Sequence, residues 1–306
     1  MKEIVNYKNG NVQIQLFEDG TRVMEYDETQ PVVFDFPTSM DIKITNYCDG
    51  TCEFCHEKSN KKGKHADWVA LLDILDSLPG GQEIAIGGGN PLDHPKLALI
   101  LYNCKQKNFL PSLTVNFQHL NSHFDKLNLL IREKLIYGLG ISIPTNGIQK
   151  FTEDEKYFLQ YPHTVAHLII GLHKPDIIND LRNTFGLKKF LLLGYKEFGR
   201  GIQYYKKFSS DIENNIQMWN KNVIQILMGN NIISFDNLSI EQLDMQKKLP
   251  KEIWEKNYQF DDFTSTMYID AVEQVFAPTS RSDERVKWSE ITLLDYFRTY
   301  SNKVPF

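Results

Sequence analysis

From residue 41 onward, short apolar runs alternate with longer stretches in which apolar residues recur every three or four positions. The short runs predict buried strands, and the longer stretches predict helices with one apolar face. The predicted strands are Asp41–Thr45, Glu83–Ile86, Leu113–Phe117, Gly140–Ile143, Val165–Ile170, Lys189–Leu193, Ile232–Phe235 and Met267–Val272. Helical stripes run from Trp68 to Leu78, from Leu97 to Cys104 and from Ile212 to Val223.

Repeated alternation of strands and helices is typical of an α/β fold, with parallel strands inside and helices outside. The number of units in this length fits a full or partial (β/α) barrel better than an open sheet, which remains the alternative. We therefore predict one barrel domain over residues 41–306, which ends in a C-terminal helix.

Residues 1–40 follow a different pattern. Val12–Phe17 alternates apolar and polar side chains, a turn follows, and Arg22–Tyr26 is predicted to return as a second strand. These residues are predicted to form a β-hairpin attached to the barrel. It serves either to dock a peptide by strand addition or to cap one end of the barrel.

The composition indicates a soluble globular protein of 306 residues, with 42% hydrophobic and 24% charged residues. The net charge of −5 argues against a dedicated duplex-binding protein, because such proteins usually carry a basic surplus. The first residues show no apolar signal segment, and no run of 18 apolar residues occurs. We therefore expect a cytoplasmic protein whose thiols stay reduced.

Three of the four cysteines lie close together, as Cys48, Cys52 and Cys55 in the spacing C-x3-C-x2-C. They follow the first predicted strand of the barrel, and loops after parallel strands form the active face of such folds. Three thiolates can hold three irons of a [4Fe–4S] cluster and leave the fourth iron open to another ligand. Cys104 lies on the apolar stripe of a helix and is interpreted as a buried structural thiol, so only one cluster is expected.

Zinc is the main alternative for this cysteine set. A structural zinc site needs a fourth ligand, which His56, His65 or Cys104 would have to supply, and the chain would then be a non-catalytic zinc-stabilised binding protein. The C-x-x-C-H pattern of haem attachment also matches Cys52–His56, but that attachment needs an exported protein. The strand before the cysteines and the glycine loop after them favour the iron–sulfur interpretation.

The cysteine spacing, with aromatic Phe54 before the third cysteine, resembles the signature of the radical S-adenosylmethionine (SAM) superfamily. In that family the amino and carboxylate groups of SAM chelate the open iron. Reduction cleaves SAM to methionine and a 5′-deoxyadenosyl radical, which abstracts hydrogen from a substrate. The resemblance thus implies a radical SAM enzyme with one [4Fe–4S] cluster on Cys48, Cys52 and Cys55.

A second element of the resemblance follows the second strand. Gly87–Pro91 stands where the family usually has Gly-Gly-Glu-Pro, which receives the amino group of SAM, and Asn90 replaces the glutamate. Glycine lets a backbone approach a ligand closely, and the asparagine oxygen can still accept a hydrogen bond. The residues that the resemblance implies near SAM are Phe54, His56, Gly87, Gly88, Gly89, Asn90, Pro91, Asn116, Ser142, Gly171 and Leu193.

Several polar side chains near predicted strand ends are candidates for substrate contact or proton transfer, with ordinary structural roles as the alternative. The cations are suited to a substrate carboxylate or phosphate. The substrate itself stays open among peptides, nucleosides or nucleic acids, and small metabolites. The candidates are His119, His173, Lys196 and Arg200, with Asp236 and Asp270 near the late strands.

A basic run, Lys58–His65, follows the cysteines and holds four lysines. Most such runs are solvated loops. Because the cluster must receive an electron, the functional alternative is docking of an acidic electron donor such as flavodoxin or ferredoxin. Binding of a polyanionic substrate is a third interpretation.

Overall fold

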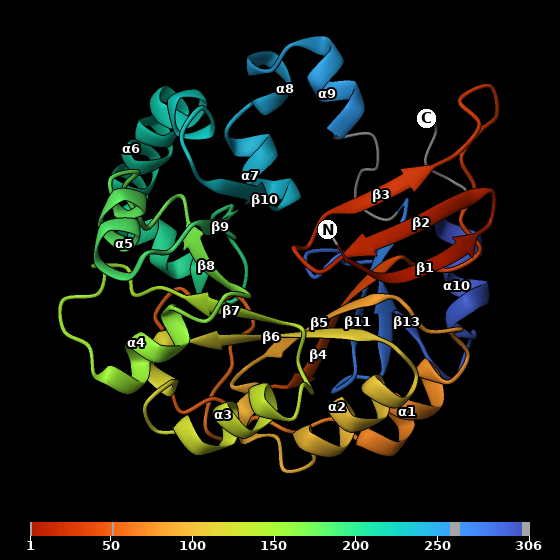
Figure 1. Cartoon of the computed structure of the whole chain (residues 1–306). Helices are drawn as coiled ribbons and strands as arrows, with labels where there is room; N and C mark the ends of the chain where they lie inside the picture. Colours follow the sequence, from red (N-terminus) through yellow and green to blue (C-terminus); the bar gives the residue numbers. More distant parts are fainter. Residues whose placement is uncertain (1, 51, 258–263, 302–306) are drawn as a thin grey trace.

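The structure is a computed structural model that describes residues 2–50, 52–257 and 264–301 (Figure 1). Its strands form a small antiparallel sheet and a large, mostly parallel one. The strands are β1 (Glu3–Asn9), β2 (Val12–Phe17), β3 (Arg22–Glu25), β4 (Ser39–Thr45), β5 (Glu83–Gly88), β6 (Leu110–Asn116), β7 (Gly138–Ser142), β8 (Thr164–Ile169), β9 (Lys189–Leu193), β10 (Ile232–Phe235), β11 (Thr266–Asp270), β12 (Val275–Ala277) and β13 (Val286–Lys287).

The large sheet has the strand order β10-β9-β8-β7-β6-β5-β4-β11-β12-β13. Strands β4 to β10 are parallel to their neighbours, and β11 pairs in parallel with the other side of β4. Strands β12 and β13 then add antiparallel. Because β10 and β13 are the two edges, the sheet curves without closing. This confirms the predicted α/β class and selects the partial barrel.

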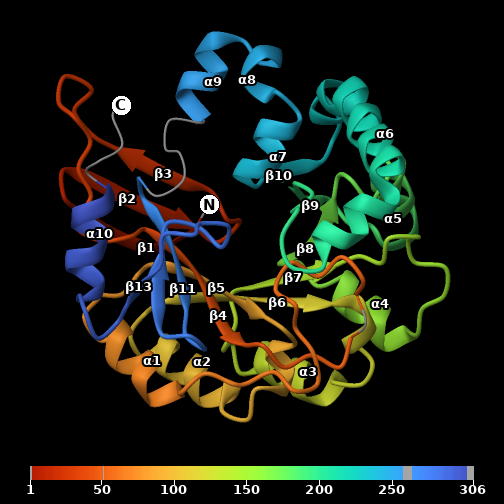
Figure 2. The same ribbon diagram turned by 180° about the vertical axis from the view of Figure 1, so that it is seen from behind.

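Helices lie on the outer side of the curved sheet in both views (Figures 1 and 2). Side chains such as Ile42, Ile86 and Leu113 are almost fully buried and join one hydrophobic core with helix residues such as Leu71 and Ile100. The main helices are α1 (Trp68–Leu75), α2 (Leu97–Gln106), α3 (Phe124–Arg132), α4 (Glu153–Leu159), α5 (Ile177–Phe185), α6 (Gly201–Leu227), α7 (Asn237–Gln242), α8 (Met245–Lys248), α9 (Lys251–Asn257) and α10 (Leu293–Ser301), with short 3-10 turns η1 (Pro91–Asp93) and η2 (Phe117–His119).

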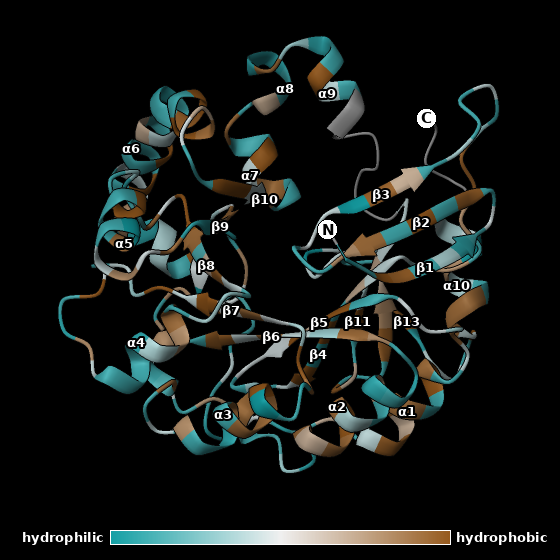
Figure 3. Cartoon of the chain, in the orientation of Figure 1, coloured by the Kyte–Doolittle hydropathy of each residue, from teal (hydrophilic) through white to brown (hydrophobic). Residues whose placement is uncertain are grey.

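The strands are the most continuous hydrophobic segments of the chain. In Figure 3 hydrophobic residues mark strands such as β7, strand β2 alternates hydrophobic and hydrophilic residues, and many peripheral loops are hydrophilic. Burial of apolar side chains on the helix-facing side of the sheet is the main stabilising contribution in such a layer. In the part of the chain that the structure describes, no helix is long and apolar enough to cross a bilayer.

The N-terminal sheet has three strands, so the predicted hairpin is incomplete: β1 was missed, and it pairs antiparallel with β2. Arg22 forms an ion pair with Glu83, the first residue of β5. The Tyr137 hydroxyl, just before β7, donates a 3.0 Å hydrogen bond to the Phe17 carbonyl. These contacts place the small sheet at the amino ends of the parallel strands, which is the end opposite the cysteine loop.

The predicted C-terminal helix is confirmed as α10. Tyr296 and Phe297 are fully buried on its inner face, and Tyr296 lies 5.3 Å from the ring of Phe276 on β12. The C-terminal segment therefore belongs to the barrel core.

Candidate functional site

The cysteines lie on a loop that leaves the carboxyl end of β4, as predicted. This loop folds back on itself through backbone hydrogen bonds. The Cys48 amide donates to the Asn60 carbonyl at 3.1 Å, and the Asn46 amide donates to the Lys64 carbonyl at 2.8 Å. Cys48, Cys52 and Cys55 are all free and half-buried, so their sulfur atoms are held in place and remain reachable.

The separation of the sulfur atoms bears on the zinc interpretation. Zinc–sulfur bonds of about 2.3 Å in a tetrahedron would place the sulfurs about 3.8 Å apart. The sulfurs of Cys48, Cys52 and Cys55 do not all lie within 4.8 Å of one another. The loop therefore does not hold the three sulfurs at the spacing of a closed zinc site, and the kind of metal centre that it takes stays a prediction.

The chemistry of the thiols fits a cluster. Burial raises the pKa of Cys48 and Cys52, and the negative charges of neighbouring thiolates raise it further. A bound cationic metal centre would compensate this repulsion, because metal ions stabilise the thiolate form. Cys104 is 1% exposed, and burial raises its pKa to about 12, as expected for an inert structural thiol.

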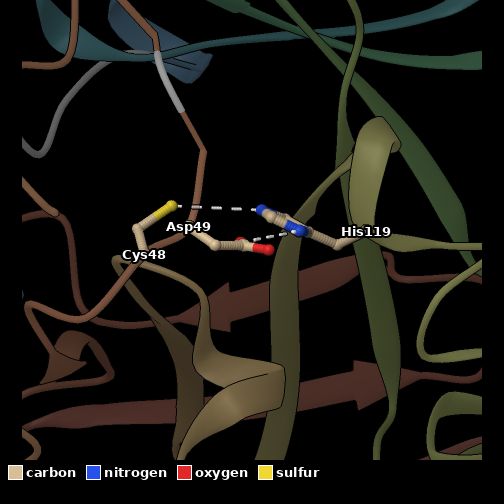
Figure 4. A group of neighbouring side chains, drawn as sticks. All are labelled: Cys48, Asp49 and His119. Carbon is tan, nitrogen blue, oxygen red and sulfur yellow. Dashed lines mark hydrogen bonds and ion pairs between the residues drawn. The ribbon is translucent and has the colours of Figure 1, made fainter. Parts of the chain in front are cut away.

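His119 lies beside the first cysteine (Figure 4). Its Nε2 atom is 3.9 Å from Cys48 Sγ, and its Nδ1 atom is 3.4 Å from Asp49 Oδ1. The imidazole is buried, which lowers its pKa. Cys48, Asp49 and His119 are the one group of close metal-ligand atoms among the described residues. This position makes His119 a neighbour of Cys48, and its contact with a substrate stays a prediction.

The end of β6 approaches the second cysteine in a similar way. The Asn116 side-chain amide points its Nδ2 atom toward Cys52 Sγ at 3.9 Å, while its oxygen accepts from the Gln118 amide at 3.1 Å. Polar groups around a metal-ligating sulfur tune its electronic properties. Asn116 is thus placed at the cysteine loop, although its predicted contact with SAM stays a prediction.

The glycine loop after β5 packs directly against the cysteine loop. The Gly89 amide donates to the Thr45 carbonyl and the Asn90 amide to the Tyr47 carbonyl, both at 2.7 Å. Gly88 has φ +118°, and a Cβ atom there would lie 2.3 Å from the Thr45 oxygen. These glycines are therefore required for close contact between two protein loops. Gly87 differs, since a Cβ atom there would meet nothing closer than 3.9 Å.

Asn90 has a structural role that the sequence did not reveal. Its side chain is 1% exposed, its Nδ2 atom donates to Asp93 at 2.7 Å, and its oxygen accepts from the Leu92 amide at 3.3 Å. It thereby caps η1, in which Pro91 is the first residue. A short polar side chain at this position is a common way to satisfy the first amides of a helical turn. An amide contact from Asn90 to SAM stays a prediction, and the exposed groups of this loop are backbone.

Arg200 is engaged by the cysteine loop, and its contact with a substrate stays a prediction. Its Nε donates to the Cys52 carbonyl at 3.0 Å and its guanidinium to the Ser59 carbonyl at 2.9 Å. Its backbone amide donates to the Cys55 carbonyl at 3.0 Å. A Cβ atom on neighbouring Gly199 would lie 2.2 Å from the His56 oxygen, so the two loops are in close contact. Arg200 positions the cysteines.

His173 also proves structural. It is 2% exposed, and its ring nitrogens lie 3.1 Å from the carbonyl oxygens of Ile169, Ile143 and Pro144. Burial lowers its pKa, which favours the neutral ring. It therefore connects the ends of β7 and β8, and these partners leave it without the accessible nitrogen that substrate contact requires.

The remaining residues implied near SAM are spread along the same end of the sheet. Ser142 and Leu193 are the last residues of β7 and β9. A Cβ atom on Gly171 would lie 2.8 Å from Ile212, so this glycine permits close packing of α6. The Phe54 ring meets Tyr204 edge-on at 5.7 Å, and His56 Nε2 lies 3.5 Å from Glu57. Direct contact of these residues with SAM stays a prediction.

A buried charge network joins the cysteine loop to the barrel, and only Asp270 was considered from sequence. Lys43 Nζ lies 2.7 Å from Glu57 and 3.0 Å from Asp270, with Lys43 7% and Asp270 2% exposed. Arg285 lies 3.5 Å from the same Asp270 oxygen. The available signal was a lysine in the middle of an otherwise buried strand, since a buried charge needs a partner.

Lys196 is the candidate that the structure places in a cavity. A cavity of about 210 Å³ is lined by residues that include Lys196, Asp236 and Tyr268. It lies where edge strand β10 ends and β11 begins. Lys196 Nζ donates to Ser280 Oγ at 3.3 Å. Its ammonium group is thus half-buried and oriented by one neutral partner, as expected for a residue that can bind a ligand.

Comparisons with known proteins agree with this geometry. SuiB of Streptococcus suis has the same fold with 13% identity and a TM-score of 0.62, covering 97% of this chain and 87% of SuiB. The structure of SuiB bound to precursor peptide SuiA is 16% identical with a TM-score of 0.59. The match covers 87% of this chain but only 65% of that SuiB chain. The structure of SuiB bound to S-adenosylmethionine is 14% identical with a TM-score of 0.59. The match covers 87% of this chain and 66% of that SuiB chain.

A search of curated proteins found no match. Residues 42–176, from the first barrel strand to the start of α5, match the model of the radical SAM superfamily. This segment contains the cysteine loop and the glycine loop, and the structural neighbours share its fold. Residues 42–176 are therefore similar to the radical SAM superfamily, a family that implies SAM and an iron–sulfur cluster.

Proposed function

We propose that this protein cleaves SAM reductively at a single [4Fe–4S] cluster on Cys48, Cys52 and Cys55, and abstracts hydrogen from a substrate. The main support is the cysteine loop at the carboxyl end of β4, where three free, half-buried thiols in the spacing C-x3-C-x2-C lie against the glycine loop. When bound, the cluster and SAM supply the radical chemistry, as cofactors do in general. The protein supplies position and exclusion of water.

The two loops at the carboxyl ends of β4 and β5 would hold both cofactors. The amides of Gly89 and Asn90 are already used by Thr45 and Tyr47. The groups left to receive the amino group of SAM are therefore backbone carbonyls of the glycine loop, and a Cβ atom at Gly87 would meet nothing closer than 3.9 Å. In this proposal Asn90 shapes the loop through its cap, and the backbone makes the contact.

The substrate would occupy the cavity that is lined by residues after β10, at the start of β11 and after β12. Lys196 in this cavity suits a carboxylate or phosphate group. Because SuiB is described bound to a precursor peptide, a peptide with an acidic side chain is the first class to test, followed by nucleotides and small metabolites. The alternative function is a zinc-stabilised binding protein, which metal analysis distinguishes from a radical SAM enzyme.

Metal analysis of anaerobically reconstituted protein tests the proposal. We expect a brown protein with about four irons and four sulfides per chain. With dithionite, it should convert SAM to 5′-deoxyadenosine and methionine. Replacing Cys48, Cys52 and Cys55 together by Ala should abolish both results.

Cys104→Ser is the matched control, because that thiol is buried in a helix away from the loop. It should keep iron, sulfide and SAM cleavage. A colourless protein that binds one zinc per chain and leaves SAM intact would refute the proposal and support the binding protein.

A further inference from the structure

His167 lies on the inner face of the curved sheet, in the middle of β8. Its neighbours along the strand, Ala166 and Leu168, are fully buried in the core that the sheet shares with the helices. Because successive side chains of a strand point to opposite faces, the imidazole of His167 points away from the helices, into the concave side. The ring is half-buried there. Its place in the middle of a strand explains why the sequence did not mark it as a candidate.

The neighbouring strand makes room for this ring. A Cβ atom on Gly140 of β7 would lie 2.4 Å from Cε1 and 2.5 Å from Nε2 of His167. Gly140 does not have a positive φ, so its backbone conformation is open to other residue types. The glycine is therefore required for space, and the missing side chain is what allows the ring to lie over β7.

The imidazole of His167 has no hydrogen-bond partner among the described residues, unlike the other buried histidines. His94, His119 and His173 each have a polar partner at both ring nitrogens. Burial lowers the pKa of His167 to about 4, and no charged side chain contributes to this shift. The ring is therefore neutral, with one nitrogen that donates and one that accepts. Polar groups inside proteins are rarely left unpaired, so this ring is suited to a partner from outside the chain.

His167 belongs to a row of residues that crosses the sheet at one level, with one residue from each of the strands β6 to β10. The strand register gives this row as Asn116, Ser142, His167, Leu191 and Ser234. The residue before each of them packs in or against the core, so all five face the concave side. Neighbouring strands are about 4.8 Å apart, which places the middle residue about 10 Å from either end of the row.

The two ends of the row are the cysteine loop and the cavity. The Asn116 side chain points its Nδ2 atom toward Cys52 Sγ at 3.9 Å. At the other end, Ser234 stands two positions before the segment that lines the cavity of Lys196. A substrate that is bound in the cavity and reacts beside the cysteines therefore has to extend along this row. His167 is the side chain in the middle of that path.

We propose that His167 is a substrate-binding residue that hydrogen-bonds a neutral hydroxyl or amide group of a substrate whose anionic group is held by Lys196. This inference rests on the proposed function, because it takes the cavity of Lys196 as the substrate site. A neutral imidazole suits a group that both donates and accepts, whereas a carboxylate or phosphate would favour its charged form. SAM is the competing ligand, but the glycine loop follows β5, and β5 is three strands away from β8.

Chemical modification measures the accessibility of His167. Diethyl pyrocarbonate acylates neutral imidazole nitrogens, and mass spectrometry of peptides identifies the modified residue. In the anaerobically reconstituted protein we expect His167 to react about tenfold faster than His173, because the engaged nitrogens of His173 must lose a hydrogen bond before they react. SAM alone should leave the rate of His167 unchanged. A rate as slow as that of His173, or full protection by SAM, would overturn the proposal.

Two pairs of small probes test the chemical class of the substrate. Glycerol 3-phosphate carries hydroxyl groups that propyl phosphate lacks, and N-acetylaspartate carries an amide that succinate lacks. At millimolar concentration, glycerol 3-phosphate or N-acetylaspartate should slow the modification of His167 several-fold, and their counterparts should not. Protection by the first indicates a hydroxylated phosphate, and protection by the second indicates an acidic peptide. Equal protection by the counterparts, or protection by no probe, would overturn the proposal, and in the latter case the ring binds water only.

Variants separate the ring from the fold. His167→Leu should bind the protecting probe about tenfold more weakly in an NMR titration, the loss expected for one hydrogen bond to a neutral group. His167→Gln keeps a donor and an acceptor and should recover part of this affinity. His163→Leu is the matched control, because His163 directly precedes β8 and its ring contacts Tyr137 and Tyr161. Equal affinity in His167→Leu and His163→Leu would contradict the proposal.

Gly140→Ala is a second variant, which keeps the imidazole but displaces it from β7. It should weaken probe binding as His167→Leu does, and unchanged binding in both variants would show that the position of the ring is irrelevant to the ligand. The proposed function fails on a different measurement. Absence of SAM cleavage with dithionite in the parent protein would overturn that function, whereas the modification and binding experiments report on His167 alone.

Discussion

Two sets of cations flank the cysteine loop, and the structure uses them in opposite ways. Lys43 and Arg200 point inward, where one meets two buried carboxylates and the other meets two backbone carbonyls. The four lysines of the run Lys58–His65 are exposed and have no ion-pair partner among the described residues. The inner set determines where the cysteines lie, and the outer set is available to another molecule. The predictions below test this division.

The largest effect is expected for Lys43→Met. This change leaves Glu57 and Asp270 buried without their shared cation, and breaking a buried pair from one side costs about 3–5 kcal/mol. Urea denaturation of the variant should show a free energy of unfolding lower by about this amount. Iron content should also fall, because Glu57 follows the third cysteine closely.

Lys247→Met is the matched control for Lys43. Lys247 pairs with Asp244 at the surface, with 80% of its side chain exposed. Its loss should change the free energy of unfolding by no more than about 0.5 kcal/mol. If both variants lose the same small free energy of unfolding, the buried network of Lys43 with Glu57 and Asp270 does not stabilise the fold.

The next effect is expected for Arg200→Gln. Two hydrogen bonds from a charged donor are lost, worth about 3 kcal/mol together, and they restrain the loop between Cys52 and Ser59. We expect lower iron retention after gel filtration and a broadened electron paramagnetic resonance signal of the reduced cluster. Arg200→Lys should restore only part of the iron retention, because a single ammonium group lacks the planar fork of donors that arginine has.

A more negative midpoint potential of the cluster in Arg200→Gln would identify a role beyond folding. Burial raises the pKa of Cys52, and the Arg200 charge opposes this increase, so it favours negative charge at that sulfur. Reduction adds negative charge to the cluster, and removal of the cation should make it harder. Redox titration followed by absorbance measures this. An unchanged potential together with full iron content would show that Arg200 does not position the site.

The contrast between the two sets also explains what the sequence could reveal. The strands were placed well because parallel strands buried on both sides read as short continuous apolar runs, as Lys189–Leu193 does. The cysteine spacing is local and chemically specific. Strand β1 was missed because Glu3–Asn9 carries polar residues on most positions and depends on its partner β2.

Roles that depend on distant contacts could not be predicted. Arg200 follows Cys52 by 148 positions, and no local pattern indicates that its donors end on that carbonyl. Similarly, nothing near His173 shows that its ring lies among the carbonyls of β7 and β8. Strand-end position marked these residues as candidates, but only the packing of neighbouring loops decided between a structural and a chemical role.

A smaller effect is expected for Gly88→Ala. The left-handed backbone and the short distance to the Thr45 oxygen should destabilise the glycine loop by about 2 kcal/mol. Gly87→Ala is the control, because its Cβ atom has room and its φ is ordinary. We expect Gly88→Ala to retain less iron, whereas Gly87→Ala keeps its iron and loses SAM affinity in equilibrium dialysis. Equal iron content and equal SAM affinity in both variants would contradict the assignment of the two glycines.

The smallest structural effect is expected for the outer set itself. Replacing Lys58, Lys61, Lys62 and Lys64 by Gln removes no ion pair that the structure describes, so the free energy of unfolding should stay within about 0.5 kcal/mol of the parent. Iron content and the midpoint potential should also be unchanged, because the backbone contacts of this loop do not involve lysine side chains. Urea denaturation and iron analysis check this directly. A clear loss of iron would mean that these lysines support the cysteine loop, and the division between inner and outer cations would then fail.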